Sequence, residues 1–336
     1  MSTLKTIARA LATAACFAAL FAASTGPAFA QEQVNVRFSW KLKGEYAPFY
    51  LAEDSGAYAR RNLAIHMGEG AGAPAALAAL LQGQEDLVVL PGIFAIDAIE
   101  RGMPIKLIAI YHPQMPIAVV GQPGSALRTP ADMLGKKMAT SVGATGATYL
   151  PPFCAINKID CSKIVQVQMN SSVGQAAFLQ GQLDMGILYL NVELPLYEEK
   201  TGKTYPILRL SDWGMSIPGL AIVASKAGIQ RRADVFRRVL AANDEAIAAA
   251  TKNPEAAASA LEKAWSGAPS HAVIEKQVKA TMGAIVPDVA GKPVGWIDPS
   301  RIAFSRKILL QGEKGQSEAP DSAFFTNDLL PRPGSR

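Results

Sequence analysis

Short apolar runs alternate with longer amphipathic segments from residue 34 to about residue 224. The short runs favour β-strands, and segments with apolar residues three and four positions apart favour helices. Repeated strand–helix–strand units with short loops predict a largely parallel sheet with helices on both faces. In the first series the expected strands are 34–40, 63–67, 87–90 and 106–111, and the expected helices are 48–61, 74–82 and 94–101.

A second series of the same kind follows a break in the pattern. The apolar segment 115–121 is followed by Gln122-Pro123-Gly124-Ser125, which is typical of a turn, and we expect the chain to cross into a second lobe there. From residue 233 the pattern is helical and rich in alanine. One expected helix of the second series follows the loop 142–147 and ends near residue 157, and another covers 174–180. The expected strands are 137–141, 164–169, 185–190, 205–210 and 220–224.

These two series predict an α/β fold of two lobes joined by a hinge of two crossing strands. Such a clamp binds a ligand between its lobes. We expect residues 31–120 to form the first part of lobe 1, residues 121–224 to form lobe 2, and residues 225–336 to form the second, mainly helical part of lobe 1.

The first thirty residues have a different composition. Lys5 and Arg9 precede an uninterrupted apolar run at 10–23, and the small-residue site Ala28-Phe29-Ala30 follows. This arrangement predicts a secretory signal peptide over residues 1–30, cleaved after Ala30. A retained membrane anchor is the less favoured alternative, because the run is shorter than the roughly 20 residues that a spanning helix needs.

Charge and cysteine content narrow the function further. The chain has 33 Lys and Arg against 28 Asp and Glu, a net charge of +5, and the basic residues are dispersed, so we expect no nucleic-acid partner. The three histidines are scattered, and we expect neither a metal nor a cofactor. Cys154 and Cys161 lie seven positions apart and form either a local disulfide or two free thiols.

Candidate binding residues in the first lobe follow the first two strands. Trp40 and Tyr46 offer rigid aromatic surfaces with polar tips, suited to walling a small ligand, and core packing is the alternative. Phe49, Tyr50 and Tyr58 are expected in the core. Gly72 opens a helix whose free N–H groups favour an anion or a carbonyl oxygen, although a plain turn accounts for it equally.

In the second lobe, a loop of glycine and hydroxyl residues opens the first helix. Ser141, Gly143 and Thr145 would let the backbone approach a bound group, and helix capping is the alternative. The loop lacks the lysine of a nucleotide P-loop. His112 precedes the first crossing, where it either senses ligand or pH or bonds to the backbone.

Several motifs together resemble one family. They are Tyr46-Ala47-Pro48-Phe49-Tyr50-Leu51-Ala52, the turns Gly83-Gln84-Glu85-Asp86 and Gly181-Gln182-Leu183-Asp184, the segment from Ser125 to Lys137, and Phe325-Thr326-Asn327. This chain resembles the nitrate, sulfonate and thiamine-pyrimidine-precursor group of periplasmic binding proteins, which serve ABC importers. The resemblance implies a type II periplasmic binding protein fold, a periplasmic location, a small-molecule ligand, and an ABC permease in the inner membrane as partner. We expect a monomer.

The same resemblance suggests a ligand. Tyr189, Asn191 and Glu193 resemble the corresponding second-lobe segment of the thiamine-precursor binders, in which the acidic residue implies recognition of an aminopyrimidine. A solvated Glu193 that opens a helix is the alternative. An organic anion, such as a sulfonate, nitrate or an aromatic carboxylate, is the alternative ligand. An enzyme similar to the thiamine-pyrimidine synthases is a further alternative, but their cysteine-rich motif is missing, and we expect no enzyme.

Overall fold

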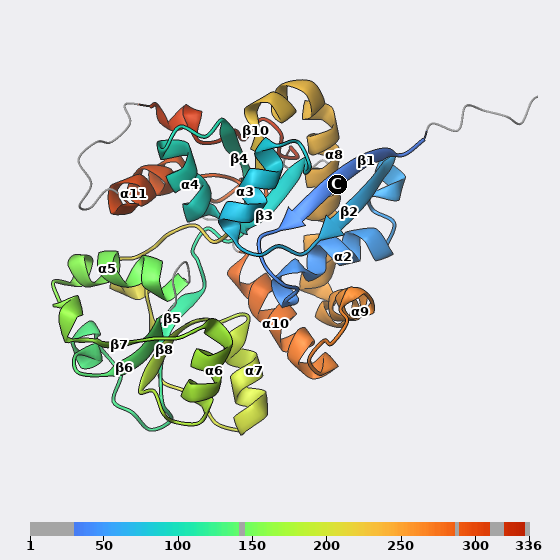
Figure 1. The fold of residues 1–336 in the computed structure, drawn as a ribbon. Coiled ribbons are helices and arrows are strands. Elements are labelled where there is room, and N and C mark those ends of the chain that lie inside the picture. The colour runs from blue at the N-terminus through green and yellow to red at the C-terminus, as the bar shows by residue number, and fades with distance from the viewer. Residues whose placement is uncertain (1–29, 141–144, 286–288, 310–318, 333–336) are drawn as a thin grey trace, which may run out of the picture.

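The first lobe is built on a five-stranded sheet. A computed structural model describes residues 30–140, 145–285, 289–309 and 319–332 of the chain (Figure 1). The strands lie in the order β2-β1-β3-β10-β4, and β10 runs antiparallel to both of its neighbours. These strands are β1 (Glu32–Phe38), β2 (Leu63–Gly68), β3 (Leu87–Pro91), β4 (Ile105–Ile110) and β10 (Leu220–Ser225).

The second lobe repeats this arrangement. Its sheet has the order β7-β6-β8-β5-β9, and here β5 is the strand that runs antiparallel to both neighbours. In each sheet the antiparallel strand is the one that has just arrived from the other lobe. The strands are β5 (Ile117–Gly121), β6 (Lys137–Thr140), β7 (Val165–Gln168), β8 (Met185–Tyr189) and β9 (Ile207–Arg209).

The chain crosses between the lobes at 111–116 and 210–219. The two-lobed α/β fold predicted from the sequence is therefore confirmed. The expected lobe boundaries fall after residues 120 and 224, whereas hydrogen bonding places all of β5 in the second sheet and all of β10 in the first. A strand belongs to the sheet with which its backbone pairs. The first crossing, 111–116, therefore ends before β5 begins, and the second crossing, 210–219, ends before β10 begins.

Helices cover both faces of each sheet. Successive side chains of β3 point to opposite faces: Leu87 and Val89 join one core cluster, and Val88 and Leu90 join the other. Strand β5 divides in the same way between the two cores of the second lobe. One core cluster of the second lobe also includes Ile93 of α4 and Ile308 of α11, so the two lobes pack against each other.

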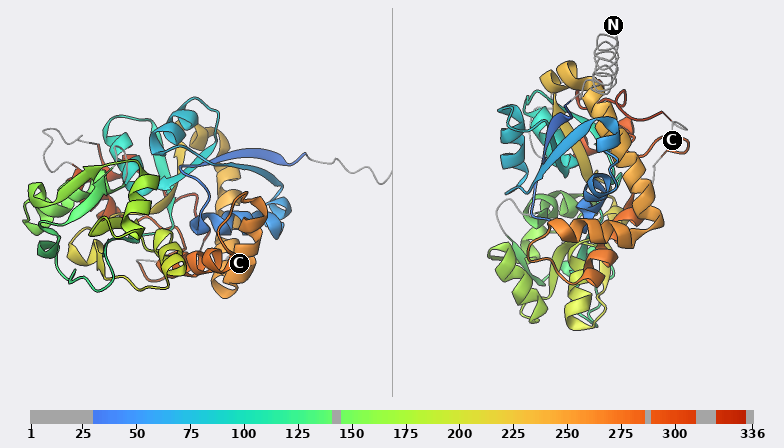
Figure 2. Two further views of the ribbon diagram at one scale, coloured as in Figure 1. Left: turned by 60° about the horizontal axis from the view of Figure 1, so that its bottom comes forward. Right: turned by 90° about the vertical axis from the view of Figure 1, so that its right-hand side faces the viewer.

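The C-terminal helices return to the first lobe. Helices α8, α9 and α10 lie along it, and α10 also contacts α7 of the second lobe (Figures 1 and 2). In the described part of the chain, none of the helices combines the length and apolarity needed to cross a membrane. The α-helices are α2 (Ala47–Asp54), α3 (Ala73–Leu81), α4 (Gly92–Glu100), α5 (Thr145–Asn157), α6 (Ser171–Leu179), α7 (Glu193–Thr201), α8 (Lys226–Lys252), α9 (Pro254–Ala264), α10 (His271–Ala284) and α11 (Pro299–Leu309). Short 3-10 helices are η1 (Gly44–Tyr46), η2 (Ala59–Arg61), η3 (Pro130–Met133), η4 (Cys161–Lys163), η5 (Ser211–Trp213) and η6 (Asp321–Ala323).

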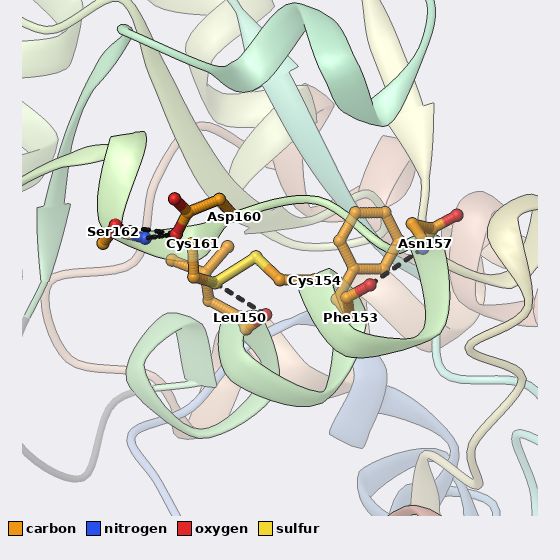
Figure 3. The surroundings of a disulfide bond; sticks show 7 residues. All are labelled: Leu150, Phe153, Cys154, Asn157, Asp160, Cys161 and Ser162. Atoms are coloured by element: carbon orange, nitrogen blue, oxygen red, sulfur yellow. Dashed lines mark hydrogen bonds between the residues drawn. A yellow bond between two sulfur atoms is a disulfide. The ribbon is translucent and has the colours of Figure 1, made fainter.

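A disulfide closes the end of α5. Cys154, in the last turn of the helix, is bonded to Cys161 at the start of η4, and their Cα atoms lie 5.7 Å apart (Figure 3). Asp160 caps η4 by accepting a 3.0 Å hydrogen bond from the backbone N–H of Ser162. The bridge thus holds the turn that leads from α5 into β7.

We expect the double variant Cys154→Ser/Cys161→Ser to unfold with a free energy about 2–3 kcal/mol lower than the oxidised protein, because a short closed loop restricts the unfolded chain. Urea unfolding followed by circular dichroism measures this difference. A reducing agent should lower the midpoint of the parent protein and leave the variant unchanged. Equal midpoints for the reduced and oxidised parent protein would contradict a stabilising role.

Candidate ligand-binding cleft

Two loops of the first lobe meet at the carboxyl ends of β1 and β2. The N–H of Gly72 donates a 2.7 Å hydrogen bond to the carbonyl of Ser39, and that of Gly70 donates a 3.3 Å bond to Trp40. A Cβ atom at Gly70 would lie 2.2 Å from the carbonyl oxygen of Phe38, so only glycine allows this approach. These backbone hydrogen bonds join the two loops and restrict the conformation of the segment that leads from β1 toward the second lobe.

That segment carries a buried ion pair. The Nζ atom of Lys43 lies 2.6 Å from Oε1 of Glu45, and both side chains are largely buried. Burial lowers the pKa of Lys43, but Glu45, Tyr46 and Tyr189 together outweigh burial, and the net pKa is raised above its usual value. Burial likewise raises the pKa of Glu45, and Lys43, His112 and Asn191 together more than reverse this effect. Both groups therefore stay charged at neutral pH.

The second lobe and α10 contact this pair. The Nδ2 group of Asn191 is 3.3 Å from Oε2 of Glu45 and 3.1 Å from Oγ1 of Thr281. Gln277 accepts a 2.9 Å hydrogen bond from the N–H of Gly44 and donates a 2.7 Å bond to the carbonyl of Val192. Helix α10 thus connects the loop after β1 with the loop after β8.

His112 lies beside the ion pair at the first crossing. Its side chain is 1% exposed, and its Nε2 atom has no hydrogen-bond partner among the described residues. Burial lowers the pKa of His112 to about 4, against the opposing effect of Glu45, and a hydrogen bond with the Thr281 backbone is present. The imidazole is therefore neutral at neutral pH.

Glu193 opens α7 in the loop that follows β8. Its Oε2 atom accepts a 2.9 Å hydrogen bond from the backbone N–H of Tyr189, so the carboxyl group also shapes its own loop. Burial raises the pKa of Glu193, and Lys43 partly offsets this effect. Tyr189 and Glu193 line a cavity of about 140 Å³ between the sheet, α6 and α7, together with Thr140, Asn170 and Tyr197. The carboxyl ends of β6, β7 and β8 meet there, the usual ligand position of open α/β sheets.

The residues predicted from the sequence take different positions. Tyr189, Asn191 and Glu193 come together around the ion pair and the cavity. Trp40 is 50% exposed, whereas Tyr46 is 1% exposed and stacks on Phe38 with ring centroids 4.1 Å apart. Gly72 precedes the first turn of α3. Ser141 and Gly143 lie outside the described residues, as does the side chain of Thr145, whose backbone begins α5.

Sequence analysis did not select Lys43, Glu45, Gln277 or Thr281. Lys43 and Glu45 flank a glycine in a polar loop, a pattern that usually indicates solvent exposure. The available signal was the spacing of Gln277 and Thr281, four positions apart on one face of a helix. Both are buried, although neighbouring Lys276 and Lys279 are exposed.

The two lobes share an α/β fold and meet at this cluster of charged and polar side chains. The family model described as NMT1/THI5 like matches residues 43–257. That match covers more than half of the chain, so the protein belongs to the NMT1/THI5-like family. No curated protein sequence matches the chain.

Solved structures share the fold. The periplasmic aliphatic sulphonate binding protein SsuA from Escherichia coli superposes with a TM-score of 0.67 at 18% identity, covering 83% of this chain and 90% of its own. The periplasmic nitrate-binding protein NrtA from Synechocystis PCC 6803 gives 0.62 at 14% identity, with coverages of 88% and 86%. The ligand-binding component of an ABC-type import system from Staphylococcus aureus gives 0.67 at 15% identity, with coverages of 89% and 98%. At these identities the likeness establishes the fold.

Burial separates the two aromatic candidates of the first lobe. Tyr46→Ala should lower the free energy of unfolding by about 3–5 kcal/mol, because it removes a stacked core ring. Trp40→Ala should change it by less than about 1 kcal/mol, because the side chain is half exposed. Urea unfolding of the ligand-free proteins measures both values, with Tyr46→Phe as a control that keeps the ring. Equal losses for the two alanine variants would contradict the assigned positions.

His112 should make stability depend on pH. Its folded pKa of about 4 is below the unfolded value of about 6.5, so the unfolded state binds more protons between these values and stability falls as the pH drops through this window. The loss amounts to roughly 3 kcal/mol at most. His112→Asn, which keeps a donor for Thr281, should reduce this loss when urea unfolding is compared between pH 4 and 7.

The neighbouring groups remain in both proteins of this comparison. Glu45 has a lowered pKa and loses stabilisation at low pH, whereas Glu193 has a raised pKa and acts in the opposite direction. Because His112 and Glu45 affect each other's pKa, the difference between the parent protein and His112→Asn reports the histidine together with its coupling to Glu45. Parallel pH profiles would contradict a buried neutral His112.

Proposed function

We propose that the protein is a periplasmic solute receptor for a small, amine-bearing heteroaromatic molecule, such as a pyrimidine precursor of thiamine. The lobes enclose the ligand, and the closed form delivers it to the permease of an ABC importer. Binding changes the populations of open and closed states and makes no covalent change. Family membership and the predicted signal peptide support this role.

The charge balance of the cleft carries the choice of ligand. Two buried carboxyl groups, Glu45 and Glu193, lie around the single ammonium of Lys43, and the Glu45 carboxylate neutralises that ammonium. A ligand that donates hydrogen bonds from an exocyclic amine satisfies carboxylate acceptors. An anion placed there would lie beside the Glu45 carboxylate and the Glu193 carboxyl group, and it would compete with Glu45 for the ammonium of Lys43. The rings of Tyr46 and Tyr189 add flat surfaces suited to a planar ligand.

An organic anion is the second candidate ligand. It is favoured by the fold likeness to proteins whose names specify sulphonate or nitrate. In that case Lys43 would leave Glu45 and bind the anion directly. We further propose that the receptor acts as a monomer, since one chain supplies both lobes of the cleft.

Calorimetric titration of the purified protein tests the ligand class. We expect 4-amino-5-hydroxymethyl-2-methylpyrimidine to bind, and its 4-oxo analogue to bind at least tenfold more weakly, because the oxo group offers no amine to a buried carboxylate. Ethanesulfonate, nitrate and benzoate serve as the anion set.

Binding of an anion without binding of the aminopyrimidine would overturn the proposed ligand and favour the second candidate. Chemical conversion of a bound compound would overturn the receptor role. Chromatography of the ligand after incubation with the protein detects such conversion. Recovery of unchanged aminopyrimidine supports reversible binding.

A further inference from the structure

The ammonium of Lys43 lies in an aromatic site formed by both lobes. Its Nζ atom is 5.2 Å from the ring centre of Tyr46 and 5.1 Å from that of Tyr189. Tyr46 belongs to η1 in the first lobe, and Tyr189 ends β8 in the second lobe. With Glu45 at 2.6 Å, the ammonium has two aromatic faces and one carboxylate, which is how proteins bind organic cations.

Unsatisfied polar atoms lie close to this ammonium. Oδ1 of Asn191 and Nε2 of His112 are buried and have no hydrogen-bond partner among the described residues. Asn191 donates from its Nδ2 atom to Glu45. The charges of Glu45 and Lys43 both affect the pKa of His112, in opposite directions. A buried acceptor or donor without a partner costs free energy. A lysine ammonium on Glu45 leaves both atoms unpaired, whereas a larger ligand with several polar groups would satisfy them.

We propose that Lys43 is an internal occupant of a cation subsite, and that an amine-bearing ligand displaces it during binding. This step rests on the receptor function proposed above. The ligand amine would take the position between the two rings and the hydrogen bond to Glu45. The flexible lysine stem would carry its own ammonium back toward water, where it is readily hydrated.

A tethered occupant also sets specificity. Lys43 competes at the effective concentration of a linked group, on the order of millimolar or higher. A simple alkylammonium ion offers only the contacts that Lys43 already makes, so it gains nothing by displacing it. A planar ring that carries an amine and also bonds to Asn191 or His112 makes additional contacts. Lys43 in this subsite therefore excludes small cations, and heteroaromatic amines that make the additional contacts displace it.

Chemical rescue tests the subsite without knowledge of the natural ligand. Lys43→Ala removes the ammonium from its place beside the two rings and leaves Glu45 without this partner. We expect butylammonium chloride to raise the melting temperature of Lys43→Ala by about 2 °C or more relative to sodium chloride at the same ionic strength. The parent protein and Lys41→Ala should show no such difference. Lys41 is a matched control from the same loop, and its side chain is 72% exposed beside Glu69.

A second variant keeps the test decisive if Lys43→Ala does not fold. Lys43→Met retains a chain of similar length without the charge, and it should bind 4-amino-5-hydroxymethyl-2-methylpyrimidine about tenfold more tightly than the parent protein because the competitor is gone. Rescue by butylammonium supports the subsite even if this pyrimidine does not bind, in which case only the proposed ligand fails. Absence of rescue in folded Lys43→Ala, or weaker pyrimidine binding by Lys43→Met, would overturn displacement and leave the receptor function standing.

Discussion

The buried ion pair of Lys43 and Glu45 is the constraint on which the cleft depends. Removing two such charges from water costs several kcal/mol for each ion, and their attraction offsets this cost only when the remaining polar atoms are also satisfied. Here the second lobe supplies part of that environment, through the Tyr189 ring and the Asn191 amide. The environment that offsets the cost of burying the pair thus comes from both lobes.

The topology brings these groups to one place. Both sheets have the same strand order, with an antiparallel strand that arrives from the other lobe. The parallel strands of each sheet therefore end toward the crossing segments, and the loops after β1 and β8 meet across the cleft. Helix α10 fixes this meeting by bonding to the backbone of Gly44 and of Val192. The site is consequently built by residues far apart in sequence, while Ile93 of α4 and Ile308 of α11 join the first lobe to a core of the second.

Much of the fold followed from the sequence, because apolar periodicity reports directly on which side chains are buried. The two strand–helix series and the long helical C-terminal part have counterparts in the structure, whereas the chain crosses at 111–116, before the expected boundary at residue 121. The chemistry of the cleft did not follow in the same way. Lys43 and Glu45 belong to a polar loop whose burial is decided by the other lobe, and no local pattern encodes that. Tyr46 illustrates the same limit, since its place under Phe38 depends on how η1 turns after β1.

Fold likeness alone leaves ligand choice open, because the loops rather than the sheets carry the contacting groups. Relatives named for sulphonate or nitrate share the two-lobed framework at less than 20% identity, which leaves these loops free to differ. In this chain the loop after β1 brings one cation and one anion, and the loop after β8 adds a second carboxyl group. The cleft therefore has no positive charge left over for a bound anion while Lys43 stays on Glu45. If a ligand amine replaces that ammonium, Glu45 again has a hydrogen-bond donor, so the carboxylate that Lys43 satisfies between the lobes would be satisfied by the ligand.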